Sequence, residues 1–525
     1  MVSFLFKKLN STTGGAAIIV AVFSFLSDLV ALFRERLLAS RFGAGDTLDI
    51  YYAAFRLPDF LFQTFILGAL GAALVPIFLS LYAKDKEKGW QLAAGLLWLL
   101  AIIMIVASII LFFIAPWVIP WFVPGFTPEK QQQTILLTRI MLLGITFLTA
   151  SNVFSATLHS LRRFVAASLA PILYNVGIII GIIFLVPQFG ITGLAWGVVM
   201  GAIIHALAHV PALIQAGMVW RPAKIWNPEI KKVFFLMIPR VFSLAVNQVS
   251  QTVITAISST LVLGSVAVYN LASNLVSVPV GIIGVSMAIA SFPLLSQSVV
   301  NEAKEEFASH FSWVIRRILY MIIPVTVIFI ILRAQIVRLI YGAGKFTWGN
   351  TIDTFQVFAV LSLSLFAQAI IPVLVRAFFA HQDTKTPVVV NILTVALQSC
   401  LAWWWGESLG VLGVALAVSV GSVFSLLLFY VALRLKSGPL GEAGILQAIF
   451  RISLASILTA VVVQLVKTGV GSILEHLTPL GTKTVVGIMI QGGLAGGLGL
   501  LFYIVLTLAL RFPEVAVITD RLKRT

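Results

Sequence analysis

The sequence is poor in cysteine and in charged residues. It has one cysteine, Cys400, so an intramolecular disulfide is impossible and a cluster of cysteine metal ligands is excluded. Charged residues make up 10% of the chain, against about 25% in a typical soluble domain. In contrast, 60% of the residues are hydrophobic, and the mean hydropathy is +1.06. These values exclude an ordinary cytosolic enzyme and a disordered chain, and they predict a protein solvated mainly by lipid.

Polar segments long enough to form a catalytic domain are also missing. A spanning helix needs about 20 apolar residues, so the chain has room for roughly fourteen spans and short loops. We therefore predict an all-α integral membrane protein with about 14 transmembrane helices and no soluble catalytic domain. Apolar runs separated by charge, Gly or Pro place these helices at 14–41, 48–83, 89–115, 132–160, 164–186, 191–218, 230–262, 265–299, 308–341, 352–380, 386–405, 410–435, 443–467 and 484–511.

Acidic residues are scarcer than basic ones, with 19 against 35 and a net charge of +16. Most of the basic excess lies in short segments between apolar runs, as membrane insertion favours. When both termini are placed in the cytoplasm, 22 basic residues fall on the inner side and 6 on the outer side. This bias predicts cytoplasmic termini.

A weak internal repeat suggests how the helices are grouped. His159 and His381 are 222 residues apart, and so are Arg163 and Lys385. Each of the two pairs, His159 with Arg163 and His381 with Lys385, lies at the end of a predicted helix. The spacing suits an N-lobe at 1–218 (helices 1–6), a C-lobe at 228–437 (helices 7–12) and a C-terminal helix pair at 443–513 (helices 13–14).

Some charged residues fall at membrane depth, where ionisable groups normally face a cavity or a partner. On the first helix, Ser24, Ser27, Asp28, Arg34 and Glu35 share an arc of about 120°. This polar face is either a cavity wall in which Arg34 binds an anionic group or an ion-pair cluster between packed helices. The seven deep basic residues are Arg34, Arg36, Arg41, Arg56, Arg139, Arg240 and Arg376.

Uncharged polar stripes occur on other helices. They either join helices by hydrogen bonds or line a cavity shared by both lobes. The eighth helix carries Asn270, Ser273, Asn274 and Ser277, the seventh carries Asn247, Gln248 and Gln251, and the fourth carries Ser151, Asn152, Ser155 and His159.

The second helix mixes scaffold and functional signals. Asp46 can cap its start, and Asp49 can complement its N-terminal dipole. Arg56 and Asp59 are i, i+3 neighbours that can pair, and Pro58 predicts a kink. Asp49 and Arg56 therefore fit a scaffold role and a functional role equally well.

Two apparent motifs carry little weight. The segment Gly342 to Lys345 lacks the earlier glycine of a phosphate-binding loop, where Leu339 stands instead. His205 and His209 are spaced i, i+4 without the intervening Glu of a metalloprotease, so a helix-packing pair is favoured over a metal site.

Taken in order along residues 10–435, a set of short motifs resembles the MurJ (MviN) lipid II flippases of the multidrug/oligosaccharidyl-lipid/polysaccharide exporter superfamily. The two further C-terminal helices also suit this family. The matching residues are Arg41-Phe42-Gly43-Ala44-Gly45, Asp49, Ala54-Phe55-Arg56-Leu57-Pro58, Val75-Pro76, Arg163-Phe164, Ala170-Pro171, Asn175, Pro279, Gly281, Gly284, Pro293, Tyr341-Gly342, Gly344-Lys345-Phe346-Thr347 and Gln382-Asp383-Thr384-Lys385-Thr386-Pro387.

The resemblance implies a fourteen-helix flippase of the bacterial cytoplasmic membrane. Such a protein moves undecaprenyl-pyrophosphate-linked peptidoglycan precursor, lipid II, to the outer leaflet by alternating access. It implies cationic residues in a central cavity that meet the pyrophosphate, and a groove for the lipid tail at helices 13 and 14. The matched positions are Arg34, Asp49 and Arg56. Membrane lipids and cell-wall synthesis proteins are the implied partners, and no nucleic acid is expected.

The chain departs from the family pattern at several cavity positions. Asp28 stands where the first helix usually has a further arginine, and Ser273 and Asn274 replace an Asp-Arg pair on the eighth. The second helix has Phe62, Gln63 and Leu67 where the family has arginine and an acidic residue. The seventh helix has no carboxylate beyond Glu229, so a sodium site of the kind found in some relatives is not evident.

The favoured function is therefore lipid II translocation without a cofactor or metal, driven by membrane potential or an ion gradient. Arg34 and Arg56 would contact phosphate, Asp28, Glu35 and Asp49 would orient or gate, and Asn270, Ser273 and Asn274 would contact the head group. The alternatives are a flippase for another lipid-linked oligosaccharide, an ion-coupled exporter of soluble cationic compounds that uses Asp28 and Glu35 as cation ligands, and a scaffold without transport.

Overall fold

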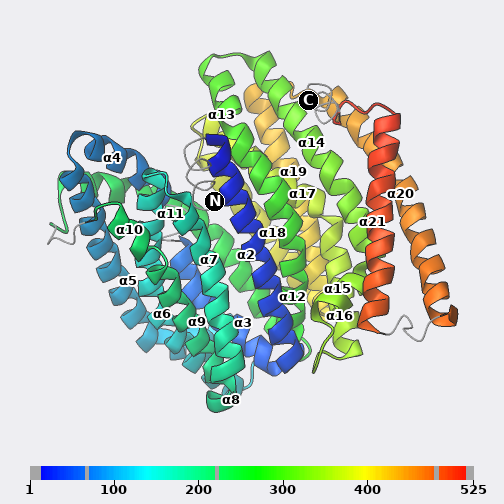
Figure 1. The fold of residues 1–525 in the computed structure, drawn as a ribbon, viewed down its shortest axis with the longest axis horizontal. Helices are drawn as coiled ribbons and strands as arrows, with labels where there is room; N and C mark the ends of the chain where they lie inside the picture. Colours follow the sequence, from blue (N-terminus) through cyan, green and yellow to red (C-terminus); the bar gives the residue numbers. More distant parts are fainter. Residues whose placement is uncertain (1–12, 65–69, 219–223, 478–483, 516–525) are drawn as a thin grey trace. The chain divides into compact units, whose positions relative to one another are not determined.

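The computed structural model describes residues 13–64, 70–218, 224–477 and 484–515, and every regular element in these ranges is helical (Figure 1). The chain divides into two compact units, Met1–Ala267 and Val268–Thr525. The first unit contains α2(Thr13–Phe42), α3(Asp46–Phe62), α4(Leu70–Lys84), α5(Lys86–Phe122), α6(Pro128–Ser160), α7(Phe164–Ile180), the π-helical turn η2(Gly181–Leu185), α8(Val186–Phe189), α9(Thr192–Leu207), α10(Val210–Gln215) and α11(Pro228–Ser259).

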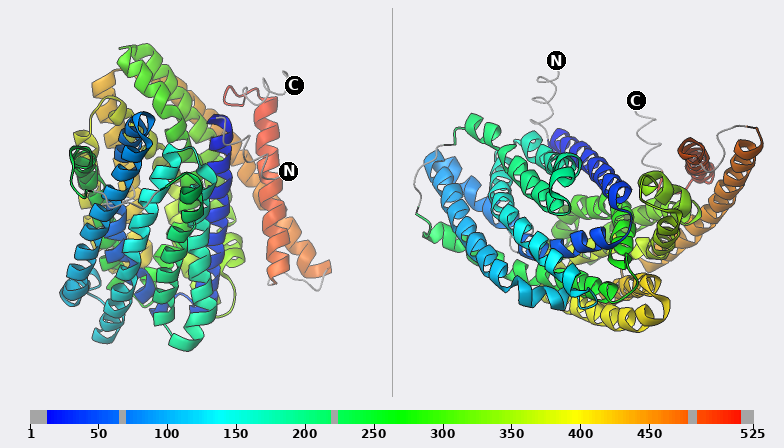
Figure 2. Two further views of the ribbon diagram at one scale, coloured as in Figure 1. Left: turned by 60° about the vertical axis from the view of Figure 1, so that its left-hand side comes forward. Right: turned by 90° about the horizontal axis from the view of Figure 1, so that it is seen from below.

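The second unit begins within α12(Ser265–Pro279). It continues with the π-helical turn η3(Val280–Val285), α13(Ser286–Val300), α14(Lys304–Ile331), α15(Arg333–Tyr341), α16(Trp348–Leu363), α17(Leu365–Ala380), α18(Lys385–Leu409), α19(Val411–Ser437), α20(Glu442–Leu477) and α21(Val485–Ala509). The α20–α21 pair packs on α14 and α15, and Figure 2 shows it in orange to red at the side of its unit.

The membrane-protein prediction agrees with the helix lengths. Among the described residues, ten helices are long and apolar enough to cross a membrane, and α16 with α17, bent by 48°, would make an eleventh. The other predicted spans correspond to α2, α3 with α4, and α11, which carry more charged or polar residues. The structure is therefore consistent with the predicted number of helices.

Several predicted helices have different ends in the structure. Pro116 predicts that the third helix ends at 115, yet α5 continues through Pro116 and Pro120 to Phe122. The predicted helix 308–341 is interrupted at Leu332, between α14 and α15. The first unit extends to Ala267 and includes α11, which contacts α3, α4 and α5. The lobe boundaries at 218 and 228 remain a prediction.

Glycines allow two helices of the first unit to approach closely. Gly177 and Gly181 face Gly201 and Gly197 across the contact between α7–η2 and α9. A Cβ atom on Gly177 would overlap the Gly201 backbone, so this contact requires residues without side chains. Small residues four apart are a common way to pack helices in lipid, where apolar side chains gain little by leaving the bilayer. The contact fixes the relative positions of α7 and α9.

Two of the deep arginines bind backbone at the π-helical turns. The Arg41 Nη1 atom donates to the carbonyl of Ile182 at 2.9 Å, and Ile182 lies in η2. The Arg376 Nη1 atom donates to the carbonyl of Val285, the last residue of η3, at 3.4 Å. A π-helical turn disturbs the regular hydrogen-bond ladder, so its carbonyls are available to other donors. These arginines are therefore occupied by the scaffold of their own units.

Candidate functional site

A polar cavity of about 520 Å³ lies between α2, α3, α6, α7 and α9 of the first unit. Its wall includes hydroxyl, amide, imidazole and carboxylate groups among apolar side chains. In a helical bundle solvated by lipid, such groups need water, a ligand or a protein partner because burying them in hydrocarbon is costly. We therefore regard this cavity as the candidate functional site.

The α2 helix contributes Ser24, Ser27 and Asp28 to the cavity wall. These residues belong to the polar stripe that the sequence places on one face of the first helix. Arg34 and Glu35 belong to the same stripe but lie six and seven residues beyond Asp28, or about 9–10 Å further along the helix. The stripe therefore has two parts, a cavity-lining part and an ion-pair part.

The ion-pair part is a network around Arg34. Its Nη1 donates to Asn175 Oδ1 at 2.7 Å, and its Nη2 pairs with the carboxylate of Glu35. The Tyr52 hydroxyl donates to the second oxygen of that carboxylate. The Glu35 side chain is 3% exposed and that of Arg34 is 20% exposed. Asn175 also lines the cavity, so Arg34 lies next to the cavity wall. Its positive charge is balanced there by Glu35.

The α3 helix adds a second carboxylate to the cavity. Asp59 and Gln63 line the wall, and Asp59 is within electrostatic range of the Arg56 and Arg34 guanidinium groups. Arg56 and Asp59 are thus close enough to influence each other electrostatically, and the predicted i, i+3 ion pair between them stays a prediction. As a result, the wall presents two carboxylates, Asp28 and Asp59, whereas the Arg34 guanidinium beside Asn175 is paired with Glu35.

The α6 stripe divides between the cavity and a neighbouring helix. Asn152, Ser155 and His159 line the wall. Ser151 instead contacts the end of α9 and the residue before α10. Its Oγ lies 2.5 Å from His205 Nδ1 in α9 and 3.1 Å from Nδ1 of His209, which precedes α10. His209 is fully buried, and its Nδ1 also lies 3.0 Å from the His205 carbonyl oxygen. These contacts agree with the expected helix-packing pair, although His205 also reaches the cavity wall.

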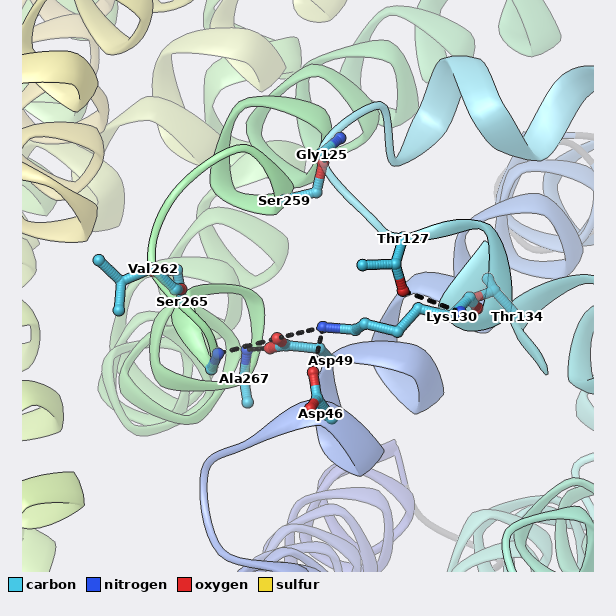
Figure 3. A network of polar contacts seen from close by, with 11 residues as sticks. Asp46, Asp49, Gly125, Thr127, Lys130, Thr134, Ser259, Val262, Ser265 and Ala267 are labelled. Atoms are coloured by element: carbon cyan, nitrogen blue, oxygen red, sulfur yellow. Dashed lines mark hydrogen bonds and ion pairs between the residues drawn. The ribbon is translucent and has the colours of Figure 1, made fainter. Parts of the chain in front are cut away.

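Asp49 lies outside this cavity and binds the start of α12 (Figure 3). Its Oδ2 accepts from the Gly264 N–H and its Oδ1 accepts from the Ala267 N–H, both at 2.9 Å. The residue is 2% exposed. The first N–H groups of a helix have no partner within the helix, so a carboxylate there satisfies them and complements the helix dipole. Asp49 therefore acts as a cap supplied by α3 to a helix that begins 216 residues later.

Lys130, at the start of α6, links both acidic residues of the first α3 turn. Its Nζ atom pairs with the Asp46 carboxylate and lies 3.4 Å from Asp49 Oδ2 (Figure 3). It also lies 4.2 Å from the centre of the Phe126 ring. In the sequence, Lys130 is one of the 6 basic residues that the charge bias places on the outer side. Its role in balancing Asp49 depends on the fold and has no local sequence signal.

The α12 residues of the predicted site belong to the second unit. Asn270, Ser273 and Asn274 are half-buried, and each is described within that unit alone. On the same helix, the Ser277 hydroxyl donates to the Asn274 carbonyl oxygen at 2.8 Å. The side chains of Arg240 and Asn247 lie outside the described part of the chain, as does Leu67.

Sequence reasoning missed part of the wall. Tyr174, Ser168 and His205 line the cavity but were not proposed as site residues, and Asn175 was noted only as a matching motif position. Tyr174 and Asn175 follow Pro171 on a mostly apolar helix, so their spacing alone gives no amphipathic pattern. The steps of three residues from Ser168 to Pro171 and of four residues from Pro171 to Asn175 become informative only when the partner helices are known.

A second opening, a groove of about 880 Å³, lies in the second unit between α15, α16, α20 and α21. Its wall includes Gln335, Arg338, Glu475, His476 and Gln491. Gln335 Nε2 donates to Gln491 Oε1 at 3.0 Å, and Gln491 Nε2 donates to the Lys467 carbonyl oxygen at 3.0 Å. This chain of amides joins α15, α21 and α20. The groove therefore has a fixed polar floor at the helix pair for which the resemblance implies a lipid-tail groove.

The family model described as "Lipid II flippase MurJ" matches residues 38–489 of this chain. A probable lipid II flippase MurJ from Vibrio cholerae is 28% identical over 438 residues, which cover 80% of this chain and 83% of that protein. The residues matched by the family model include α3, α6, α7 and α9, which contribute most of the residues that line the cavity.

Solved structures give the same relationship. A lipid II flippase MurJ in an inward closed conformation is 25% identical, with a TM-score of 0.76 over 94% of this chain and 100% of that chain. An inward-facing multidrug resistance MATE family transporter of the MOP superfamily is 18% identical, with a TM-score of 0.67 over 81% of this chain and 99% of that chain. The second similarity shows the fold alone.

Proposed function

The chain belongs to the lipid II flippase MurJ family, and we propose that it translocates undecaprenyl-linked peptidoglycan precursor, lipid II, across the bacterial cytoplasmic membrane. It is a multi-pass membrane protein, with ten long apolar helices among the described residues. Translocation would proceed by alternating access and would serve cell-wall synthesis. The 22-to-6 bias of basic residues supports an orientation with both termini in the cytoplasm.

The observation that carries this proposal is the polar cavity inside a bundle whose outer surface is apolar. A saccharide-peptide head group cannot cross hydrocarbon without a polar path. A volume of about 520 Å³ is within the range of about 300–1,000 Å³ typical of small-molecule sites, so this cavity would hold part of such a head group. The names of the matching relatives favour this cargo over soluble cationic compounds.

The charges of the cavity suggest which end of the cargo lies where. The pyrophosphate would lie toward Arg34 and Arg56, since guanidinium groups bind phosphate oxygens well. Sugar hydroxyls, amides and any ammonium group of the peptide would lie toward Asp28 and Asp59, because two carboxylates repel a phosphate. Glu35 would hold Arg34 in place, and Asp49 would act through the position of α12. Asn270, Ser273 and Asn274 would contact polar atoms of the head group.

We propose that membrane potential or an ion gradient drives the cycle, without nucleotide hydrolysis or a resident cofactor. Cell-wall synthesis proteins would receive the cargo on the outer side. The segment Gly342 to Lys345 lacks the glycine spacing of a nucleotide-binding loop, and the chain consists mainly of apolar helices, which supports a cycle without nucleotide hydrolysis.

Complementation would test the proposed cargo. The full chain is expressed in a bacterium depleted of its own lipid II flippase, and both growth and outer-leaflet lipid II are measured. We expect both to recover. Membrane fractionation must show that the chain is expressed and inserted; if it is, and neither readout recovers, lipid II is the wrong cargo. Recovery of drug efflux instead would favour the exporter alternative.

A further inference from the structure

Arg139 on α6 is a charged residue at membrane depth that the proposed transport cycle does not use. Its Nε donates to the Phe112 carbonyl oxygen of α5 at 2.9 Å, and its guanidinium carbon lies 4.7 Å from the centre of the Phe112 ring. Within the described part of the chain, no acidic side chain forms an ion pair with Arg139. Its two contacts are with a neutral carbonyl oxygen and an aromatic ring, and neither supplies a negative charge to balance the guanidinium.

The depth of Arg139 can be estimated from the tryptophans of α5. Trp117 and Trp121 are 69% and 81% exposed, as expected for side chains at a membrane interface. Phe112 precedes Trp117 by five residues, which places its carbonyl about 7–8 Å further along the helix toward the membrane interior. Arg139 is held at this carbonyl. Its guanidinium therefore lies just below the interface, within reach of a lipid head group by a small extension of the side chain.

An apolar pocket of about 380 Å³ adjoins this guanidinium. It lies between α5 and α6 on a lipid-facing side of the first unit, where Ile109 and Phe113 are 51% and 64% exposed. Among the described residues, the buried Ser108 hydroxyl in its wall has no hydrogen-bond partner. The apolar wall is completed by Ile105, Phe112, Leu142 and Leu143.

The pocket and the arginine together have the character of an amphiphile site, with one cationic group, one free hydroxyl and an apolar wall. A charged group costs several kcal/mol at the centre of a bilayer and less near the interface, where an anionic partner can compensate it. We propose that this pocket binds an anionic phospholipid, whose phosphate pairs with Arg139 and whose acyl chain lies along Ile109 and Leu143. The lipid would act as a structural partner of α5 and α6, whatever cargo the protein carries.

The test uses the purified full-length chain in detergent and native mass spectrometry. Phosphatidylglycerol and phosphatidylethanolamine are added in turn, and the lipids retained per protein are counted. We expect the wild type to retain phosphatidylglycerol preferentially and Arg139→Gln to bind it about fivefold more weakly, the effect of one basic residue near an anionic lipid. Arg139→Lys, which keeps the charge, should retain most of the preference.

A matched control is available in the second unit. Arg333 makes the same two kinds of contact, since its Nη1 donates to the Ile330 carbonyl oxygen at 2.7 Å and its guanidinium carbon lies 5.5 Å from the Phe355 ring. Arg333→Gln should leave phosphatidylglycerol binding unchanged. Leu143→Trp, which fills the pocket without removing the charge, should weaken binding even if Arg139→Gln does not fold.

Several results would overturn the proposal. One is equal retention of the two lipids by the wild type, and another is an unchanged preference in Arg139→Gln. Displacement of the lipid by excess inorganic phosphate would show that Arg139 binds only an anion. If a copurified membrane protein is crosslinked to the Arg139 surface while the lipid preference is absent, a carboxylate of that protein is the partner instead.

Discussion

The carboxylate oxygen Oδ1 of Asp49 accepts a 2.9 Å hydrogen bond from the backbone N–H of Ala267, a residue 218 positions later in the chain. The other oxygen accepts from Gly264, whose φ of +87° brings its N–H into the same turn. The start of α12 is thus stabilised by a charged cap from α3, and not by a side chain of its own. A residue that the family pattern marks for function therefore has a defined structural role here.

Replacing Asp49 should destabilise the protein. Asp49→Ala leaves the buried N–H groups of Gly264 and Ala267 without their acceptor and removes one of the two carboxylates that Lys130 contacts. We therefore expect a loss of about 2–3 kcal/mol in unfolding free energy. Asp49→Asn, which keeps one acceptor oxygen, should lose less. Chemical unfolding in detergent would measure both. Asp46→Ala is the control, because Asp46 pairs with the same lysine but is 48% exposed; equal losses in the two alanine variants would contradict the capping role.

Transport should depend on the planar guanidinium of Arg34, which holds two partners at once. Arg34→Lys keeps the positive charge but cannot hold Asn175 and Glu35 with one rigid planar group. We expect outer-leaflet lipid II in the complementation assay to fall about tenfold, the change given by losing one hydrogen bond to a charged group. Asn175→Ala should reduce it in the same direction. Thermal melting is measured in parallel, because a matching loss of stability would mean that Arg34 is only a structural ion-pair residue.

The glycine contact between α7 and α9 should tolerate no side chain. Gly177→Leu would force the helices apart, and we expect a loss of about 3 kcal/mol or more because neither backbone can move aside. Tyr174, Asn175 and His205 would move with these helices, so cavity-dependent transport should fall as well. The control is Gly493→Leu on α21, where a Cβ atom meets nothing within 4 Å. Similar melting temperatures for both variants would show that the close approach is not required.

Asp383 should contribute stability only while it is ionised. It lies in the turn between α17 and α18, 2.6 Å from Lys436 Nζ, and it also accepts from the Thr386 N–H and hydroxyl. Partial burial opposes ionisation, but the hydrogen bonds from Lys436 and Thr386 outweigh it and lower the pKa of Asp383 to about 2.

Because this pKa is lower in the folded state, the stabilisation is fully present above the unfolded value, about 3.9, and is lost as the pH falls toward 2. We expect Asp383→Asn to melt at a lower temperature than the wild type at pH 7. The difference in unfolding free energy should be about 1 kcal/mol or less, because Lys436 is partly exposed. The difference in melting temperature between the wild type and Asp383→Asn should decrease between pH 4 and pH 2. A difference in melting temperature that stays constant over this pH interval would show that the charge of Asp383 is not its cause.

The membrane fold and part of the cavity could be predicted from sequence because both depend on local periodicity. The positions of Ser24, Ser27 and Asp28 on one helix face follow from 100° per residue, and all three line the cavity. The same rule placed Arg34 and Glu35 on that face, but it could not separate a cavity wall from an ion pair. That distinction depends on Asn175, which is 141 residues away.

Other features could not be predicted because they arise from contacts distant in sequence. Asp49 meets Ala267, and Arg41 meets Ile182, with no local pattern that marks either pair. Proline was also a poor guide to helix ends. Pro116 predicts a helix end, yet in an apolar helix the lost backbone hydrogen bond is accommodated and α5 continues to Phe122.

The π-helical turns η2 and η3 change the phase of the helices that contain them. Each wider turn takes up about one residue more than an α-helical turn, so the side chains after it are rotated by about 100° relative to an uninterrupted helix. A helical wheel drawn through Ile180 and Val186, or through Pro279 and Ser286, would therefore assign later residues to the wrong face. Homologues that lack such a turn should align here with a one-residue gap, and lipid-facing and cavity-facing positions should be compared only after that gap is placed.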